Sequence, residues 1–398
     1  MIKKIGHLYK EAYTGLPRDT WILAIAEFIN RSGFMVLFFL NIYLTDRLGF
    51  NLSKAGQVIS AYGIGAIIGS YLGGWLCEYV GAFRILKLSF ALSGIFLIIA
   101  GQISTFWILF LLILLYGTAS SAFFPASDTV ISQLCEGELR SRGYALRRLA
   151  SNLGITIGPA VGGYLVLVDY HLLFWVDGIT SLAAAVFLYE YLKKGFETKN
   201  IQSNTEIVSI SPFKDIYFLV YLVFFLILMT AFAQLFSTFP LYLYRVYQLP
   251  ESRIGPLLAV NTIIIVLFEM VLLYSLRKKP VMNFIILGSL LIGCGYALLP
   301  LGRSFLFAAF TVIVWTMGEI FVLPLSTTAV ANRAGASAGR YLGLYSLTFA
   351  LSMLISPIIG NNIYDAWGGN ILWLSVGIVG LICAVGFLFL RHKITQQP

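Results

Sequence analysis

Charged side chains are scarce in this sequence of 398 residues. They make up 11% of the chain against 59% hydrophobic residues, and the mean hydropathy is +0.86. Soluble domains carry about 25% charged residues, so this composition excludes a water-soluble core. A membrane-spanning helix needs about 20 apolar residues, and the chain has room for twelve such helices. We therefore expect an all-α membrane protein with twelve transmembrane helices.

Residues that carry enzymatic, metal or nucleotide chemistry are also few. The three histidines, His7, His171 and His392, lie in the termini or in a loop. The four cysteines lack metal-ligand spacing, and the phosphate-binding pattern GxxxxGK[ST] does not occur. Gly65 and Gly69 are four residues apart, as in close-packed transmembrane helices rather than in a dinucleotide loop. We expect no enzyme activity, no metal site and no cofactor.

The net charge of +9 reflects membrane topology rather than a nucleic-acid partner, because Lys and Arg are scattered over short loops without a basic helix. With the N-terminus inside, 21 of these residues fall on the cytoplasmic side and 5 outside. We expect a multi-pass protein of the inner (cytoplasmic) membrane with both termini cytoplasmic. The predicted spans are 21–44, 54–77, 84–103, 106–134, 143–168, 171–194, 216–247, 252–276, 281–300, 303–331, 339–364 and 369–390.

The sequence pattern predicts two similar halves of six helices each. Moving the second half back by 199 residues places Tyr242 on Tyr43, Gly255 on Gly56 and Pro324 on Pro125. The longest polar stretch lies between the copies. We predict halves at 1–194 and 216–398, joined by a cytoplasmic linker at 195–215. Such duplicated halves are typical of secondary transporters, whose substrate site lies near the membrane midplane.

The predicted fifth helix contains a glycine stripe, Gly154, Gly158 and Gly162, followed by Gly163 and interrupted by Pro159. The stripe permits close helix contact, and the proline can bend the helix. This segment resembles the GxxxGPxxGG motif of the drug/proton antiporters of the major facilitator superfamily, which implies export coupled to protons. Helix packing alone is the alternative. We expect Gly158→Leu to damage transport more than Gly101→Leu.

The loop after the second helix resembles a degraded form of the superfamily's GxxxDRxGRR loop. Glu78 takes the acidic position, Gly81 the turn and Arg84 a basic position. An acid here can pair with a cation and a helix N-terminus and so latch one conformational state. In the fourth helix, Ile113 stands where many drug exporters carry an arginine.

Two other segments resemble the proton-coupled peptide transporters of the same superfamily. Residues 27–31 are similar to their first-helix ExxER motif, and Gly318 to Pro324 are similar to their tenth-helix GExxxxP motif. Residues 107–134 contain no lysine, although the fourth helix of that group carries one. The superfamily resemblance covers nearly the whole chain, whereas the two subfamily resemblances point in different directions.

Ionisable side chains inside the membrane are costly, at about 2.5–3.5 kcal/mol each, which makes them candidates for function. Glu27, Asn30, Arg31 and Phe34 have the spacing of one helix face, on which Arg31 can hold an anionic group and Glu27 a proton. A structural salt bridge is the alternative. Asp128 is a further proton-coupling candidate, and it can alternatively form a structural pair with Arg147 or Arg148 of the next helix.

Three further acids lie in predicted spans. Glu319 is about 24 Å along its helix from Arg303 and is the predicted principal proton carrier. Its alternative role is that of a permanently neutral, hydrogen-bonded acid. Glu269 is a further proton-coupling candidate, and Asp177 is expected near the interface. The aromatic residues Tyr62, Tyr116 and Trp315 are candidates to line the substrate cavity.

These features predict a proton-coupled secondary transporter that exports small amphiphilic molecules by alternating access. The alternatives are a proton-driven importer of peptides or other small charged solutes and a non-transporting receptor or scaffold on the same fold. The expected partners are a small-molecule substrate, protons and the lipid bilayer. The driving force is expected to be the proton gradient, and we expect a monomer.

Overall fold

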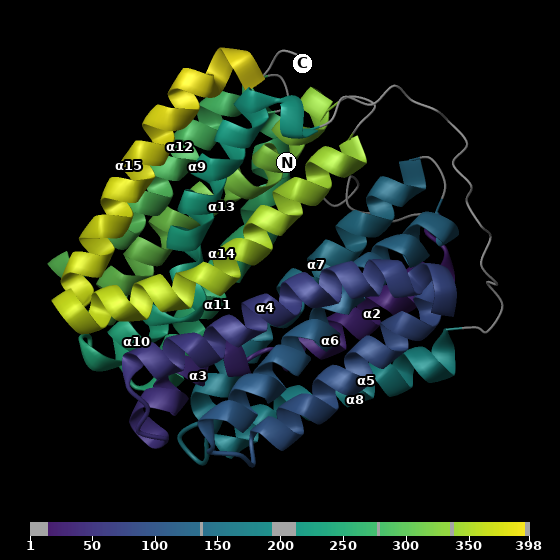
Figure 1. Ribbon diagram of the computed structural model, residues 1–398, viewed down its shortest axis with the longest axis horizontal. Helices are drawn as coiled ribbons and strands as arrows, with labels where there is room; N and C mark the ends of the chain where they lie inside the picture. Colours follow the sequence, from purple (N-terminus) through teal and green to yellow (C-terminus); the bar gives the residue numbers. More distant parts are fainter. Residues whose placement is uncertain (1–14, 136–137, 193–211, 277–278, 335–337, 395–398) are drawn as a thin grey trace. The chain divides into compact units, whose positions relative to one another are not determined.

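The computed structural model describes residues 15–135, 138–192, 212–276, 279–334 and 338–394 (Figure 1). In these ranges the chain is helical or irregular and forms no strand, as expected of an all-α protein. The α-helices are α2 (Arg18–Ser32), α3 (Val36–Ile42), α4 (Leu52–Leu76), α5 (Ala82–Ala100), α6 (Phe106–Leu134), α7 (Glu138–Leu165), α8 (His171–Tyr191), α9 (Ile216–Phe232), α10 (Thr238–Arg245), α11 (Glu251–Leu276), α12 (Val281–Ala297), α13 (Phe305–Ala334), α14 (Ala338–Trp367) and α15 (Gly369–Ile394).

Eleven helical spans in the described part of the chain are long and apolar enough to cross a membrane, so the protein is a multi-pass membrane protein. The other predicted span, 143–168, corresponds to α7. This helix has four arginines near its start, Arg140, Arg142, Arg147 and Arg148, and is therefore less apolar than the others. The count of twelve membrane spans stays a prediction.

The first predicted span is not one helix. α2 ends at Ser32, and α3 begins only at Val36 before continuing as a π-helix over Tyr43–Arg47. The span predicted at 216–247 is also divided: α9 is followed by a 3-10 turn, Ala233–Phe236, and then by α10. These breaks were not predicted, because both spans are predominantly apolar over their whole length.

The helices group into two compact units. The first comprises residues 1–36 and 65–200, and the second comprises 37–64 and 201–398. In the first unit, α5 packs on α6 and α8, and α2 packs on α7 and α8. In the second unit, α12 packs on α13 and α15, and α9 packs on α14 and α15. The same pattern of packing thus recurs in both units. The linker predicted at 195–215 lies mostly outside the described residues.

A buried ion pair joins the ends of four helices in the second unit. Arg333, at the end of α13, donates to Asp215 through Nε (2.6 Å) and Nη2 (2.5 Å). It also donates to the carbonyl of Lys393 on α15, and the Tyr341 hydroxyl on α14 donates to Asp215. Asp215 caps α9 by accepting the Phe218 N–H. We call the four residues Asp215, Arg333, Tyr341 and Lys393 the inner clasp.

Burial raises the pKa of the Asp215 carboxyl. The hydrogen bonds from Arg333, Phe218 and Tyr341, together with the charge of Arg333, outweigh that effect and bring the pKa below its ordinary value of 3.8. The aspartate therefore stays ionised throughout the neutral range.

Candidate functional site

The predicted ion pair on the first helix forms. Arg31 Nε lies 3.1 Å from Glu27 Oε1, one helical turn away, and both side chains are buried. The guanidinium also lies over the rings of Phe34 and Phe124, at 5.1 and 5.2 Å from the ring centres. Glu27 Oε2 is buried and has no hydrogen-bond partner among the described residues.

A second ion pair also lies beside Phe124. Arg147 of α7 is 2.8 Å from Asp128 of α6, so the predicted pairing of Asp128 with an arginine of the next helix forms. The Arg147 guanidinium is 5.9 Å from the centre of the Phe124 ring. The structure thus brings Glu27, Arg31, Asp128 and Arg147 together around one aromatic ring. Phe124 was not predicted, although its position four residues before Asp128 places both on one helix face.

Asn30 turns away from this cluster. Its Nδ2 donates to Ser181 of α8 at 2.8 Å. The helix ends two residues later at Ser32, so the face expected for residues 27–34 is interrupted before Phe34. Asp177, in the second turn of α8, was expected near the membrane interface, and the structure shows its surroundings within the protein. It is only 2% exposed, and its carboxylate accepts the backbone N–H groups of Met35 and Val36.

The glycine stripe of α7 lies against α2. A Cβ at Gly154 would meet the backbone and Cβ of Arg31, and a Cβ at Gly158 would lie 2.6 Å from the carbonyl oxygen of Phe34. The stripe therefore lets α7 approach the very residues that hold the Arg31 site. Pro159 lies inside α7, which runs on to Leu165, and Gly162 and Gly163 are buried.

In the second unit, Glu319 of α13 has a polar partner on α11. Asn261 Nδ2 donates to Glu319 Oε2 at 2.6 Å and also to Thr316 Oγ1 at 3.0 Å. Asn261 is buried, and Glu319 is half-buried. Asn261 was not predicted, because a lone asparagine in an apolar helix gives no signal of what it faces.

The aromatic candidates occupy different surroundings. Trp315 is fully buried and stacks on Tyr296, which stacks in turn on Trp373, with ring centres 5.5 and 5.3 Å apart. This arrangement is that of a packing residue. Tyr116 is buried in α6, and Tyr62 is half-buried in α4.

The structure also describes two other predicted residues and the turn at Gly81. Glu269 is buried in α11, and Arg84 is exposed near the start of α5. Gly81 has φ +93°, a conformation that favours glycine, in agreement with its predicted place in a turn. The Glu78 side chain lies outside the described part of the structure, so its latch contact stays a prediction.

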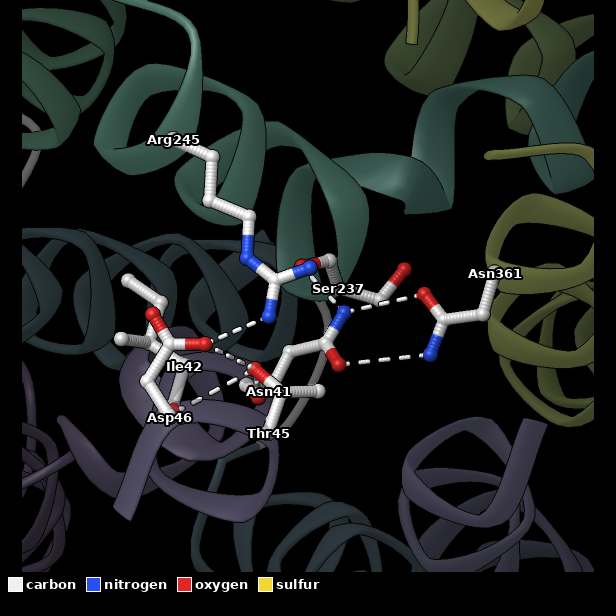
Figure 2. Close-up of polar contacts among 7 residues, drawn as sticks. All are labelled: Asn41, Ile42, Thr45, Asp46, Ser237, Arg245 and Asn361. Atoms are coloured by element: carbon white, nitrogen blue, oxygen red, sulfur yellow. Dashed lines mark hydrogen bonds and ion pairs between the residues drawn. The ribbon is translucent and has the colours of Figure 1, made fainter. Parts of the chain in front are cut away.

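A third polar cluster, also absent from the predictions, joins the start of the chain to the C-terminal helices within the second unit. Figure 2 shows Asn41 of α3 and Asn361 of α14 facing each other, with their amides bonded reciprocally at 3.0 and 3.3 Å. Asn41 also donates to the Ser237 carbonyl, and all three residues are fully buried. We call Asn41, Ser237 and Asn361 the amide latch. Beside it, Arg245 pairs with Asp46 (Figure 2).

The chain resembles known transporters over most of its length. The sequence profile described as Major Facilitator Superfamily matches residues 23–356. An uncharacterized MFS-type transporter of Bacillus subtilis, YqjV, is 25% identical over 95% of this chain and 94% of its own. A Na⁺, Li⁺, K⁺/H⁺ antiporter of Planococcus maritimus is 23% identical over 91% and 92%. The multidrug resistance protein MdtH of Yersinia enterocolitica is 22% identical over 89% and 90%.

Solved structures agree on the fold. A peptide transporter POT, crystallised as a point mutant in complex with alafosfalin, superposes with a TM-score of 0.82 at 16% identity, and the match covers 96% of both chains. Such low identity supports a shared fold only. Because the family profile spans most of the sequence and the relatives are transporters rather than enzymes, the chain belongs to the Major Facilitator Superfamily.

Proposed function

We propose that the protein is a proton-coupled secondary transporter that exports small amphiphilic molecules by alternating access. The observation that carries this proposal is the Glu319 cluster. Glu319 is a carboxyl group within a membrane-crossing helix and accepts a hydrogen bond from the Asn261 amide. Placing an ionisable group inside the membrane costs free energy, so its presence there indicates a function. Gaining and losing a proton during transport is such a function.

Glu27 and Arg31 would provide the coupling partner in the first unit. While Glu27 is ionised, it holds Arg31 at 3.1 Å. Protonation of Glu27 would weaken this pair and leave the guanidinium able to hold an anionic group of the substrate. Phe34 and Phe124 lie beside the same guanidinium, so an amphiphile could find aromatic and charged contacts together. Asp128 with Arg147 is the second pair, and Glu269 is a further candidate acid.

The proposed direction is export. It is supported by the glycine motif of α7, by an antiporter relative and by a relative named for multidrug resistance. Import of peptides or small charged solutes is the second candidate, favoured by residues 27–31 and by Glu319 in its GExxxxP segment. We place the protein in the inner membrane as a monomer of two six-helix halves, with both termini cytoplasmic.

Proteoliposomes containing the purified protein would test this function. Three probes cover the substrate classes: ethidium as an amphiphilic cation, 8-anilinonaphthalene-1-sulfonate as an amphiphilic anion, and dialanine as a peptide. A pH gradient is imposed in either direction, and protein-free liposomes serve as the control. Exporter function predicts that an amphiphile accumulates on the more acidic side, against protons. Accumulation of dialanine on the less acidic side would favour the importer. Insensitivity of every flux to the gradient would contradict proton coupling.

A further inference from the structure

The first helix is broken where it passes beside Arg31. α2 closes with the Gly33 and Phe34 N–H groups bonded to the carbonyls of Asn30 and Arg31. The first N–H groups of α3 have no partner within their own helix, as at every helix start. Inside a membrane such groups cannot form hydrogen bonds with water, and an unsatisfied one is strongly destabilising. Something else in the protein must bind them.

Asp177 of α8 meets that need. Its Oδ2 lies 3.2 Å from the Met35 nitrogen and 3.3 Å from the Val36 nitrogen, and one oxygen thus accepts both N–H groups. Asp177 belongs to another helix, 141 residues further along the chain. A capping residue ordinarily lies next to the helix that it caps, whereas this cap reaches α3 from the side.

Two glycines allow close approach of other helices at the break. A Cβ at Gly33 would collide with Thr180 and lie 3.0 Å from the Cα of Asp177, so α8 could not come as close to a larger residue. A Cβ at Gly158 of α7 would meet the carbonyls of Phe34 and Arg31. The break therefore packs against α8 near Asp177 and against α7 at Gly158.

The groups around Asp177 also fit a capping role. The positive charge of Arg31 acts on Asp177, and Arg31 is itself bound to Glu27. The positive end of α3 and its two N–H donors interact favourably with the Asp177 carboxyl group. Glu27, by contrast, has an oxygen without a hydrogen-bond partner in the described structure.

We propose that Asp177 is a positioning residue, which caps the broken first helix from α8 and so holds Phe34 beneath the Arg31 guanidinium. It acts through its oxygen atom as a hydrogen-bond acceptor rather than as a proton carrier. The consequence for transport rests on the function proposed above. The cap itself does not, and it can be measured separately.

Amide hydrogen exchange tests the cap directly. In Asp177→Ala, the amides of Met35 and Val36 should exchange about tenfold faster than in the parent protein, because their acceptor is gone. Asp177→Asn should keep the slow exchange, since asparagine caps helices about as well as aspartate. Asp169→Ala is the matched control: Asp169 is an exposed acid that accepts the His171 N–H, and its removal should leave residues 35–36 unchanged. Unchanged exchange in Asp177→Ala, or fast exchange in Asp177→Asn, would overturn the proposal.

Transport assays of Asp177 variants distinguish a positioning role from a proton-carrying role. With the probe that the parent protein moves, Asp177→Asn should keep the pH profile and a KM within about twofold of the parent value. Asp177→Ala should raise KM several-fold at an unchanged pH profile, because Arg31 is misplaced while the proton carriers remain. If Asp177→Asn loses gradient-driven transport and keeps exchange, Asp177 is a proton carrier and the proposal is wrong. If Asp177→Ala does not fold, the Asn variant and its amide exchange still decide the matter.

Discussion

Single residues in the described clusters show how polar groups are accommodated in this apolar chain. Glu27 is matched by Arg31 one turn away, Asp128 by Arg147, and Glu319 by Asn261. Only the pairing of Glu27 with Arg31 can be predicted from residue spacing alone. The other two partners belong to neighbouring helices, and the sequence does not show which side chains of two helices lie close together.

Removal of Arg31 should have two effects, one on the stability of the fold and one on transport. Arg31→Ala leaves the buried Glu27 carboxylate without its cation, which costs about 3–5 kcal/mol for a buried pair. We expect poor yield and near-complete loss of transport. Arg31→Lys keeps the charge without the planar group that lies over two rings, so partial loss is expected.

The double variant Glu27→Gln/Arg31→Ala distinguishes the two effects. It should regain yield and thermal stability, because no unpaired charge is buried, but it should remain inactive. Wild-type transport by either Arg31→Ala variant would reduce the pair to a structural salt bridge.

At the scale of helices, the glycine stripe has a measurable role. Gly158→Leu should abolish transport, because the new side chain would be forced against the Phe34 carbonyl. Gly343 of α14 is the matched control, since a Cβ there would meet nothing within 4 Å, and Gly343→Leu should keep at least half of the parent activity. Equal activity of the two variants would contradict the role of the stripe. Gly101 cannot serve as the tolerant position that we expected, because it packs against the Phe174 side chain.

The inner clasp should hold four helix ends together at any physiological pH. The pKa of Asp215 is lowered, so the ionised form stabilises the fold above the ordinary value of 3.8, and this contribution is lost only as the pH falls through the lowered value. Because Asp215 is ionised at both pH 6 and pH 8 in the parent protein, Arg333→Ala should lower the melting temperature by several degrees at each of these pH values. An unchanged melting temperature at either pH would contradict this account.

Most helices could be predicted from hydropathy, because each apolar run must cross the membrane as a closed helix. The break between Ser32 and Val36 could not. Gly33 is the sole local sign of it, and the groups that stabilise it, Asp177 and Gly158, lie more than a hundred residues away. The arginines of α7 were correctly used as partners of Asp128, but the same arginines make this helix less apolar than the rest.

At the scale of the molecule, the compact units do not follow the sequence halves. Residues 37–64 belong to the unit that contains the C-terminal helices, and the amide latch is one of their contacts with it. Neither Asn41 nor Asn361 has a distinctive spacing, so their pairing could not be predicted from the sequence.

Loss of the amide latch should expose the fully buried Ser237 position. In a cysteine-free background, Ser237→Cys should react slowly with a membrane-impermeant maleimide added outside. Addition of Asn361→Ala should speed the reaction several-fold, because the amide that faces Asn41 is gone. Cysteine at the exposed Arg253 should react at the same rate in both backgrounds. If Asn361→Ala leaves the Ser237→Cys reaction unchanged, the latch does not restrict access.

The central claim is that Glu319 carries the proton, and Glu319→Gln tests it most directly because the amide keeps the shape and hydrogen bonding of the acid while it removes the exchangeable proton. Glu190→Gln is the matched control, since Glu190 is exposed on α8. The measurement is uphill transport under an imposed pH gradient beside substrate exchange without one, in proteoliposomes. We predict that Glu319→Gln loses uphill transport and keeps exchange, and that Glu190→Gln keeps both. Uphill transport by Glu319→Gln at the parent rate would contradict the claim.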